Sequence, residues 1–297
     1  MEPPFDKATL PTGHLIRLSP LVGRLLAPNP SPYTYSGTQS YVVGSSAGDV
    51  AVIDPGPAEE AHLAALEAAI AGRPLRAILC THTHRDHSPA AAPLAARTGA
   101  KIIGCAPLTM DDDGPRADAA FDAEYRPDEV MEDGALLSGD GWTLEAIATP
   151  GHTSNHLCFA LREEKALFTG DHVMGWSTTV ISPPDGNMAD YMASMQKILD
   201  RDDVIFYPAH GDAIEKPQRL VRGMMGHRKH REGQILRLLA SSPDGMAIMS
   251  MVEEMYKGLD PKLQGAASRS VLAHLLDLEI RGLVRPVGGD KWQGKAA

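Results

Sequence analysis

Residues 75–87, LRAILCTHTHRDH, decide how this chain is interpreted. An apolar run that predicts a strand is followed directly by a polar loop with three histidines and an aspartate. In an extended loop His82 and His84 project to the same side, so two neutral imidazoles can reach one cation, and Asp86 and His87 can turn toward a second. A solvated polar loop is the alternative, but the chain has only 12 histidines in 297 residues, which makes three within six residues hard to obtain by composition.

Three further donors stand immediately after later apolar runs, each beside a glycine or a proline. They are His152 after the run 142–148, Asp171 after 166–169 and His210 after 204–207. Side chains at strand ends lie where loops converge, so we expect these donors to meet the histidine loop. A dinuclear site needs about six or seven donors, and the two sets together supply that many.

The order of predicted elements divides the chain into a mixed α/β body and a helical C-terminal module. In the body we expect a hairpin over 40–53, helices at 58–71, 88–99 and 190–199, and strands at 75–80, 101–105, 142–148, 156–161, 166–169 and 204–207. The Asp-rich segment 109–133 predicts a solvated insertion. Helical stretches at 227–240, 247–258 and 266–282, followed by a short β-like hairpin, are typical of a winged helix. We therefore predict a catalytic domain at 1–215 and a winged-helix-like domain at 216–297.

The His-x-His-x-Asp-His loop, followed by isolated His, Asp and His residues, resembles the metallo-β-lactamase superfamily over residues 38–210. The resemblance implies an α/β fold of the α+β kind, a four-layer αββα sandwich, with a zinc-type dinuclear site at one edge. It implies the following ligands: His82, His84 and His152 for the first ion, Asp86, His87 and His210 for the second, and Asp171 as the bridge. It also implies that Asp54 supports the site from behind the ligands.

A finer resemblance is to the β-lactamase-like protein 2 group. It rests on residues 29–41, NPSPYTYSGTQSY, on His227 with Arg228, and on residues 231–236, REGQIL. Zinc β-lactamases usually carry Cys or Ser where this chain has Asp171, so antibiotic hydrolysis is not the leading expectation.

These observations predict a hydrolase that uses metal-bound hydroxide to cleave an ester, a thioester or a related small-molecule bond. We expect two Zn²⁺ ions, with iron or manganese as alternatives. Asp86 and Asp171 are the predicted catalytic carboxylates, which accept or relay the proton of the nucleophile. Members of the group are associated with RNA cleavage and with thioester hydrolysis, so a single-stranded RNA endonuclease remains an alternative. A mononuclear iron dioxygenase is another. The non-enzymatic alternative is a winged-helix nucleic-acid-binding protein with a structural metal.

Charge and composition limit the kinds of partner and the location that we expect for the protein. No apolar run is long enough to cross a bilayer, three cysteines are too few for a disulfide framework, and a cytoplasmic location is expected. The net charge of −10 divides into +5 for residues 213–297, with 14 basic and 9 acidic residues, and −15 for the rest. RNA and a second copy of the chain are candidate partners, but the stretch 266–282 sets Arg269 and Arg281 against Asp277 and Glu279. We therefore expect the module to pack, to dimerise or to cover the substrate.

Overall fold

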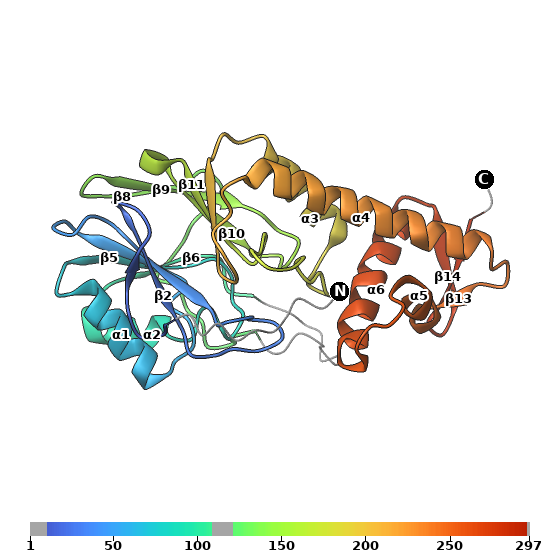
Figure 1. Ribbon diagram of the computed structural model, residues 1–297, viewed down its shortest axis with the longest axis horizontal. Coiled ribbons are helices and arrows are strands. Elements are labelled where there is room, and N and C mark those ends of the chain that lie inside the picture. Colours follow the sequence, from blue (N-terminus) through green and yellow to red (C-terminus); the bar gives the residue numbers. More distant parts are fainter. Residues whose placement is uncertain (1–10, 109–120, 296–297) are drawn as a thin grey trace.

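Two β-sheets packed face to face form the body of the molecule in a computed structural model that describes residues 11–108 and 121–295 (Figure 1). The first sheet contains, in spatial order, β1 (Ile16–Arg17), β2 (Val22–Leu26), β3 (Gln39–Val43), β4 (Val50–Ile53), β5 (Leu75–Cys80), β6 (Ile102–Gly104) and β7 (Glu129–Val130). The second contains β12 (Ile205–Pro208), β11 (Ala166–Gly170), β10 (Leu157–Leu161), β9 (Trp142–Ala148) and β8 (Leu136–Gly139). A short 3₁₀ turn, Arg162–Glu164, connects β10 to β11.

Alternating side chains on the strands define the layers. In β10, Phe159 and Leu161 join the core between the sheets, whereas Cys158 and Ala160 face the helical layer outside the second sheet. Helices α1 (Glu60–Ile70) and α2 (Ala91–Thr98) cover the first sheet, and α3 (Met188–Leu199) covers the second. The predicted four-layer sandwich is thereby confirmed. All three cysteines are buried as free thiols.

The C-terminal module has a core of its own. Its elements are α4 (Pro217–Ala240), β13 (Met246–Ala247), α5 (Ile248–Met255), a 3₁₀ turn (Pro261–Leu263), α6 (Gln264–Ile280), β14 (Val284–Gly288) and β15 (Lys291–Gly294). The three strands form a small sheet in the order β13-β15-β14. Three helices with this β-hairpin confirm the winged-helix prediction.

Helix α4 connects the two parts, and it begins ten residues before the predicted start at 227. Val221 and Met224 in its first half pack into the core of α3, while Ile235 and Leu239 in its second half are buried in the winged-helix core. The early turns lack a helical pattern of their own because Gly223 and Gly226 interrupt it; packing against α3 supplies their stability. The domain boundary at 215/216 stays a prediction.

Several short strands escaped prediction. β1 has two residues and β8 has four, and each pairs with a longer neighbour that offers backbone hydrogen bonds. β2 is a largely buried strand that pairs with β3, a strand of the same length. Within the predicted insertion, residues 109–120 lie outside the described part, but β7 pairs with β6 and extends the first sheet, so that portion is not a loop. Among the described residues no helix is long and apolar enough to span a membrane.

Candidate metal centre

All seven predicted ligands meet at one edge of the sandwich, in loops that follow strand ends. Four come from the loop after β5, and the others are His152 between β9 and β10, Asp171 after β11 and His210 after β12. The strands β4 and β5 are parallel, as are β11 and β12, so their carboxyl ends open at the same edge. The sheet topology thus gathers residues that are up to 128 positions apart, from His82 to His210.

The first donor group combines three imidazoles with one carboxylate. One ligand atom each from His82, His84, His152 and Asp171 lies within 4.8 Å of the others. The Nδ1 atom of His84 is 3.0 Å from Nε2 of His82 and 3.2 Å from Nε2 of His152. Imidazole nitrogens that converge in this way are the arrangement in which a cation can accept all their lone pairs.

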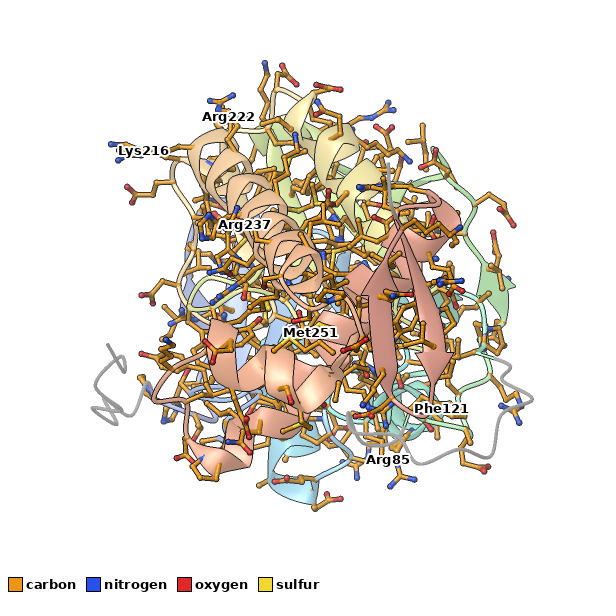
Figure 2. All side chains as sticks on the ribbon, turned by 90° about the vertical axis from the view of Figure 1, so that its right-hand side faces the viewer. Arg85, Phe121, Lys216, Arg222, Arg237 and Met251 are labelled. Atoms are coloured by element: carbon orange, nitrogen blue, oxygen red, sulfur yellow. The ribbon has the colours of Figure 1, made fainter. Side chains whose placement is uncertain are left out.

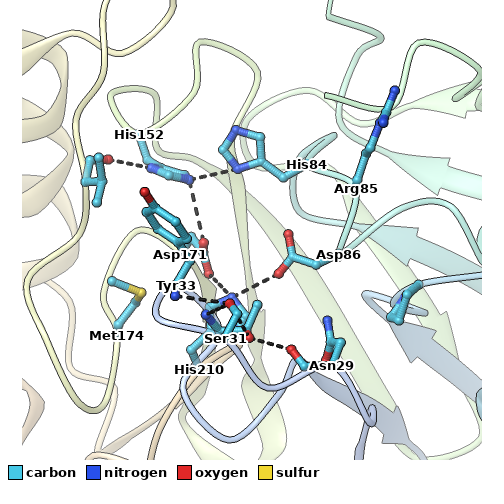
Figure 3. Close-up of a pocket in the computed structure, with 13 residues that line it drawn as sticks. Asn29, Ser31, Tyr33, His84, Arg85, Asp86, His152, Asp171, Met174 and His210 are labelled. Carbon is cyan, nitrogen blue, oxygen red and sulfur yellow. Dashed lines mark hydrogen bonds and ion pairs between the residues drawn. The ribbon is translucent and has the colours of Figure 1, made fainter. Parts of the chain in front are cut away.

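The second donor group contains Asp86, His87 and His210, and Asp171 lies between the two groups. Oδ2 of Asp86 is 3.3 Å from Nε2 of His87 and 3.2 Å from Nε2 of His210. Oδ1 of Asp171 is 3.2 Å from Nε2 of His210, whereas its Oδ2 is 3.6 Å from Nε2 of His152. The two oxygens of Asp171 therefore face different groups, which is the geometry of a bridging carboxylate (Figure 3).

Asp54 supports the second group from behind. Its carboxylate accepts hydrogen bonds from the backbone N–H and the hydroxyl of Thr81, both at 2.8 Å, and lies 3.0 Å from Nδ1 of His87. This contact directs Nε2 of His87 toward the cluster. Within the described residues, buried Nε2 of His87 and Oδ1 of Asp171 make no hydrogen bond. Buried polar atoms are rarely left so, and a cation at this place would satisfy both.

Burial and charge tune the protonation of the ligands. Burial lowers the pKa of His82 and His84, and neighbouring imidazoles lower it further, so these rings are neutral donors at pH 7. Burial would raise the pKa of Asp86 and Asp171, but His87 and His210 outweigh it and hold both well below their usual range. His82 and His84 thus offer neutral nitrogens and Asp86 and Asp171 ionised carboxylates, the forms in which these side chains bind metals. Burial opposes a charge on His87 and His210, but the two carboxylates outweigh it and raise the pKa of both, that of His210 to about 10, so a cation bound there would displace their protons.

A surrounding layer of hydrogen bonds orients the ligands, and the sequence did not reveal most of it. The hydroxyl of Thr38 donates to Oδ2 of Asp86 at 2.9 Å. Nδ1 of His152 lies 2.7 Å from the carbonyl of Val180. Nε2 of His156 accepts the backbone N–H of Asp171 at 3.2 Å. These partners are 15 to 48 residues apart in the sequence and meet only in the folded protein, so no local pattern could have identified them.

His172, the neighbour of Asp171, belongs to neither donor group. Its ring is buried against Tyr191 of α3, with 4.9 Å between the ring centroids. Both residues lie in the turn after β11, where the N–H of His172 donates to the carbonyl of Thr169 at 2.9 Å, and this turn directs Asp171 toward the cluster and His172 toward α3.

A cavity of about 310 Å³ opens over the donors. His84, Asp86, His152, Asp171 and His210 line its floor, and its walls include Tyr33, Met174 and Val180. The exposed side chain of Arg85 at the rim extends away from the donors (Figure 3). The volume and mixed lining fit a small-molecule site.

Gly151 fixes the approach of the His152 loop to α3. At φ +137° its position disfavours any side chain, and a Cβ there would lie 2.3 Å from Cα of Tyr191. We expect Gly151→Ala to lower the free energy of unfolding by roughly 2–4 kcal/mol in denaturant titrations. The control Gly134→Ala, at φ +81° with open space around it, isolates the backbone term and should cost about 1–2 kcal/mol. Equal losses in the two variants would refute the close-approach argument.

The part of the chain that holds the donors matches a known protein family. The model of the metallo-beta-lactamase superfamily matches residues 33–210, which contain every donor described above. The chain belongs to the metallo-beta-lactamase superfamily. A second model, the beta-lactamase associated winged helix domain, matches residues 247–292 of this superfamily member. The predicted family and its combination of domains are confirmed.

This metallo-beta-lactamase superfamily protein is similar to two named relatives and to one solved structure. It is 32% identical over 276 residues to the beta-lactamase-like protein 2 homolog of Caenorhabditis elegans, covering 90% of this chain and 87% of that one. It is 35% identical over 225 residues to the atrochrysone carboxyl ACP thioesterase of Aspergillus fumigatus, covering 74% of this chain but only 65% of the thioesterase. A beta-lactamase domain protein from Burkholderia ambifaria shares the fold, with a TM-score of 0.79, 19% identity and coverage of 98% and 96%. Superfamily membership and relatives named as thioesterases support a metal-dependent hydrolase.

Proposed function

We propose that this protein is a dinuclear zinc hydrolase that cleaves acyl thioesters. The observation that carries the proposal is the pair of donor groups joined at Asp171, whose two oxygens face different groups. Relatives named as ACP thioesterases favour a thioester over the other bonds that such a centre can cleave.

The donor set fits two zinc-type ions. His82, His84 and His152 would hold the first ion, Asp86, His87 and His210 the second, with Asp171 shared. Imidazole and carboxylate donors suit zinc, although iron and manganese accept the same set. Bound divalent ions supply Lewis acidity toward the carbonyl and lower the pKa of water toward neutrality.

The side chains of the protein orient the ligands and the substrate, and they receive the proton of the nucleophile. Asp86 is the carboxylate that a proton can reach more easily, because its side chain is 26% exposed against 12% for Asp171. The hydroxyl of Thr38 fixes one of its oxygens. The carbonyl of Val180 fixes the ring of His152. Tyr33 and Met174 in the cavity wall would hold the acyl chain and exclude water.

The competing functions draw less support. A mononuclear iron dioxygenase would leave Asp86, His87 and His210 without a role. An RNA endonuclease that reads RNA through α6 would need a basic face there. Arg281 is instead neutralised by Glu232 at 2.7 Å and by Asp277 at 3.1 Å.

Metal analysis and a substrate panel test the proposal together. Protein purified without chelator should contain about two zinc-type ions per chain and should hydrolyse S-acyl pantetheine thioesters. Chelation should abolish this turnover, and added Zn²⁺ should restore it. Matched oxygen esters and single-stranded RNA serve as comparison substrates. Full activity in protein free of transition metal, or cleavage of RNA alone, would contradict the proposal.

A further inference from the structure

A second cavity lies between the body and the winged-helix module. Its volume is about 310 Å³, and it is lined by the segment Trp176–Val180 of the body and by residues of α4 and α6. Tyr33, Met174 and Val180 line both this cavity and the one over the metal centre. The two cavities therefore adjoin, and a substrate bound over the metal centre lies next to the second cavity.

The lining of the second cavity is basic. Arg228 and Arg231 of α4 contribute guanidinium groups, with His227 beside them, and no aspartate or glutamate is among the described residues that line it. Burial and the two arginines lower the pKa of His227, so its ring is a neutral hydrogen-bonding group at pH 7. The fixed charge of the cavity is therefore that of the two guanidinium groups.

Arg228 carries its charge into the interior without a carboxylate partner among the described residues. It is only 4% exposed. Its guanidinium donates to the carbonyl of Thr179 and to Oγ of Ser270, the latter at 3.2 Å, and lies 5.4 Å from the ring of Tyr191. Buried charges are ordinarily paired because their desolvation is costly. An anionic ligand would supply the missing counter-charge.

Arg231 is held in place by neutral groups. Its guanidinium lies 4.0 Å from the ring centroid of Tyr256 and donates to Oε1 of Gln234 at 2.9 Å and to the carbonyl of Met255 at 3.0 Å. These contacts order the side chain without neutralising it. A pre-ordered guanidinium binds phosphate or carboxylate oxygens with little loss of conformational entropy.

We propose that the second cavity is an anion subsite, which holds a phosphate or carboxylate of the thioester substrate while the thioester carbonyl lies at the metal centre. This assignment rests on the proposed thioesterase function. A cavity of this size takes one small anionic group, and the net charge of −10 disfavours a polyanion. The anion can belong to the thiol half of the substrate, as in 4′-phosphopantetheine, or to the acyl half.

Four substrates separate these two sources in steady-state kinetics of the metal-loaded enzyme. The substrates are the butyryl and succinyl thioesters of pantetheine and of 4′-phosphopantetheine, which carry no anionic group, one in the acyl half, one in the thiol half, or one in each half. Arg231→Met should raise KM about 10- to 100-fold for the substrates whose anion occupies the subsite, with kcat and the neutral butyryl-pantetheine unaffected. A loss confined to phosphopantetheine thioesters assigns the thiol half, and a loss confined to succinyl thioesters assigns the acyl half.

Arg237→Met is the matched control, because Arg237 is an exposed arginine on the same helix (Figure 2) and does not line this cavity. It should behave as wild type with all four substrates. Arg231→Lys keeps the charge but not the planar fork, and should fall between wild type and Arg231→Met. An intermediate KM for Arg231→Lys would show that the loss in Arg231→Met arises from the missing guanidinium and not from misfolding.

A binding measurement tests the subsite apart from turnover. Calorimetric titration with S-methyl-4′-phosphopantetheine and with S-methylpantetheine compares a charged and a neutral ligand that cannot be hydrolysed. If the enzyme hydrolyses no thioester but binds the charged ligand in an Arg231-dependent way, the thioesterase proposal fails and the anion site stands. If neutral thioesters are cleaved but Arg231→Met changes neither KM nor binding of any anionic ligand, the subsite is refuted. An effect of Arg231→Met on RNA cleavage alone would also refute it.

Discussion

Asp171→Ala should reduce thioester hydrolysis by roughly 10³-fold, because removal of the shared carboxylate withdraws several kcal/mol of transition-state stabilisation. The variant should lose its second ion more readily than its first. Each group keeps three donors, but Asp171 lies nearer the second group, 3.2 Å from Nε2 of His210 against 3.6 Å from Nε2 of His152, so the second group loses more. Elemental analysis after dialysis against a weak chelator, with kcat measured on the same sample, checks both effects.

Two further variants make this result specific. Asp171→Asn preserves the volume and one oxygen but removes the charge, and it should show a loss of the same kind. Asp202→Ala removes a carboxylate that is 81% exposed and paired only with Lys165 at the surface, and it should retain two ions and full turnover. An Asp171→Ala enzyme with two tightly held ions and normal kcat would show that the bridge is assigned wrongly.

Truncation after Asp212 should destabilise the body rather than leave an active catalytic fragment. Val221 and Met224 of α4 and Ala273 of α6 are buried in the same core as Tyr191 and Met195 of α3. Exposing such an apolar surface costs about 1.5–3 kcal/mol for each large side chain. We expect the fragment to aggregate or to melt at least about 10 °C below the full chain. Thermal unfolding and turnover of butyryl-pantetheine measure this.

A substitution in the full chain separates the effect of lost packing from the effect of removing the C-terminal residues. Met224→Lys places a charge in the α3 core and should reproduce much of the destabilisation, whereas Arg222→Met, at an exposed position of the same helix, should not. A soluble fragment with the melting temperature and turnover of the full chain would contradict this packing role. If such a fragment had also lost RNA affinity, the module would be a nucleic-acid-binding attachment instead.

The histidine loop was predictable because its information is local. Three histidines and an aspartate within six residues, directly after a buried strand, define a metal-binding loop whatever surrounds it. His152, Asp171 and His210 were found for a related reason, since each follows an apolar run that is easily predicted as a strand. Their pairing into two groups came from the family resemblance. The structure adds the distances between these donors, which place Asp171 between the two groups.

The sequence by itself determined the order of helices and strands, the two kinds of domain and the candidate donors at strand ends, because periodicity and strand-end position are properties of short segments. The four-layer sandwich came from the family resemblance. Tertiary structure alone decided that Thr38 and Val180 orient ligands, since their partners lie 48 and 28 residues away. It also decided the full length of α4, whose two halves are stabilised by different cores. The basic cavity beside Arg228 and Arg231 is also a feature of the tertiary structure. An arginine is ordinary in a helical sequence, and only the folded surroundings of Arg228 reveal that its charge is buried without a counter-charge among the described residues.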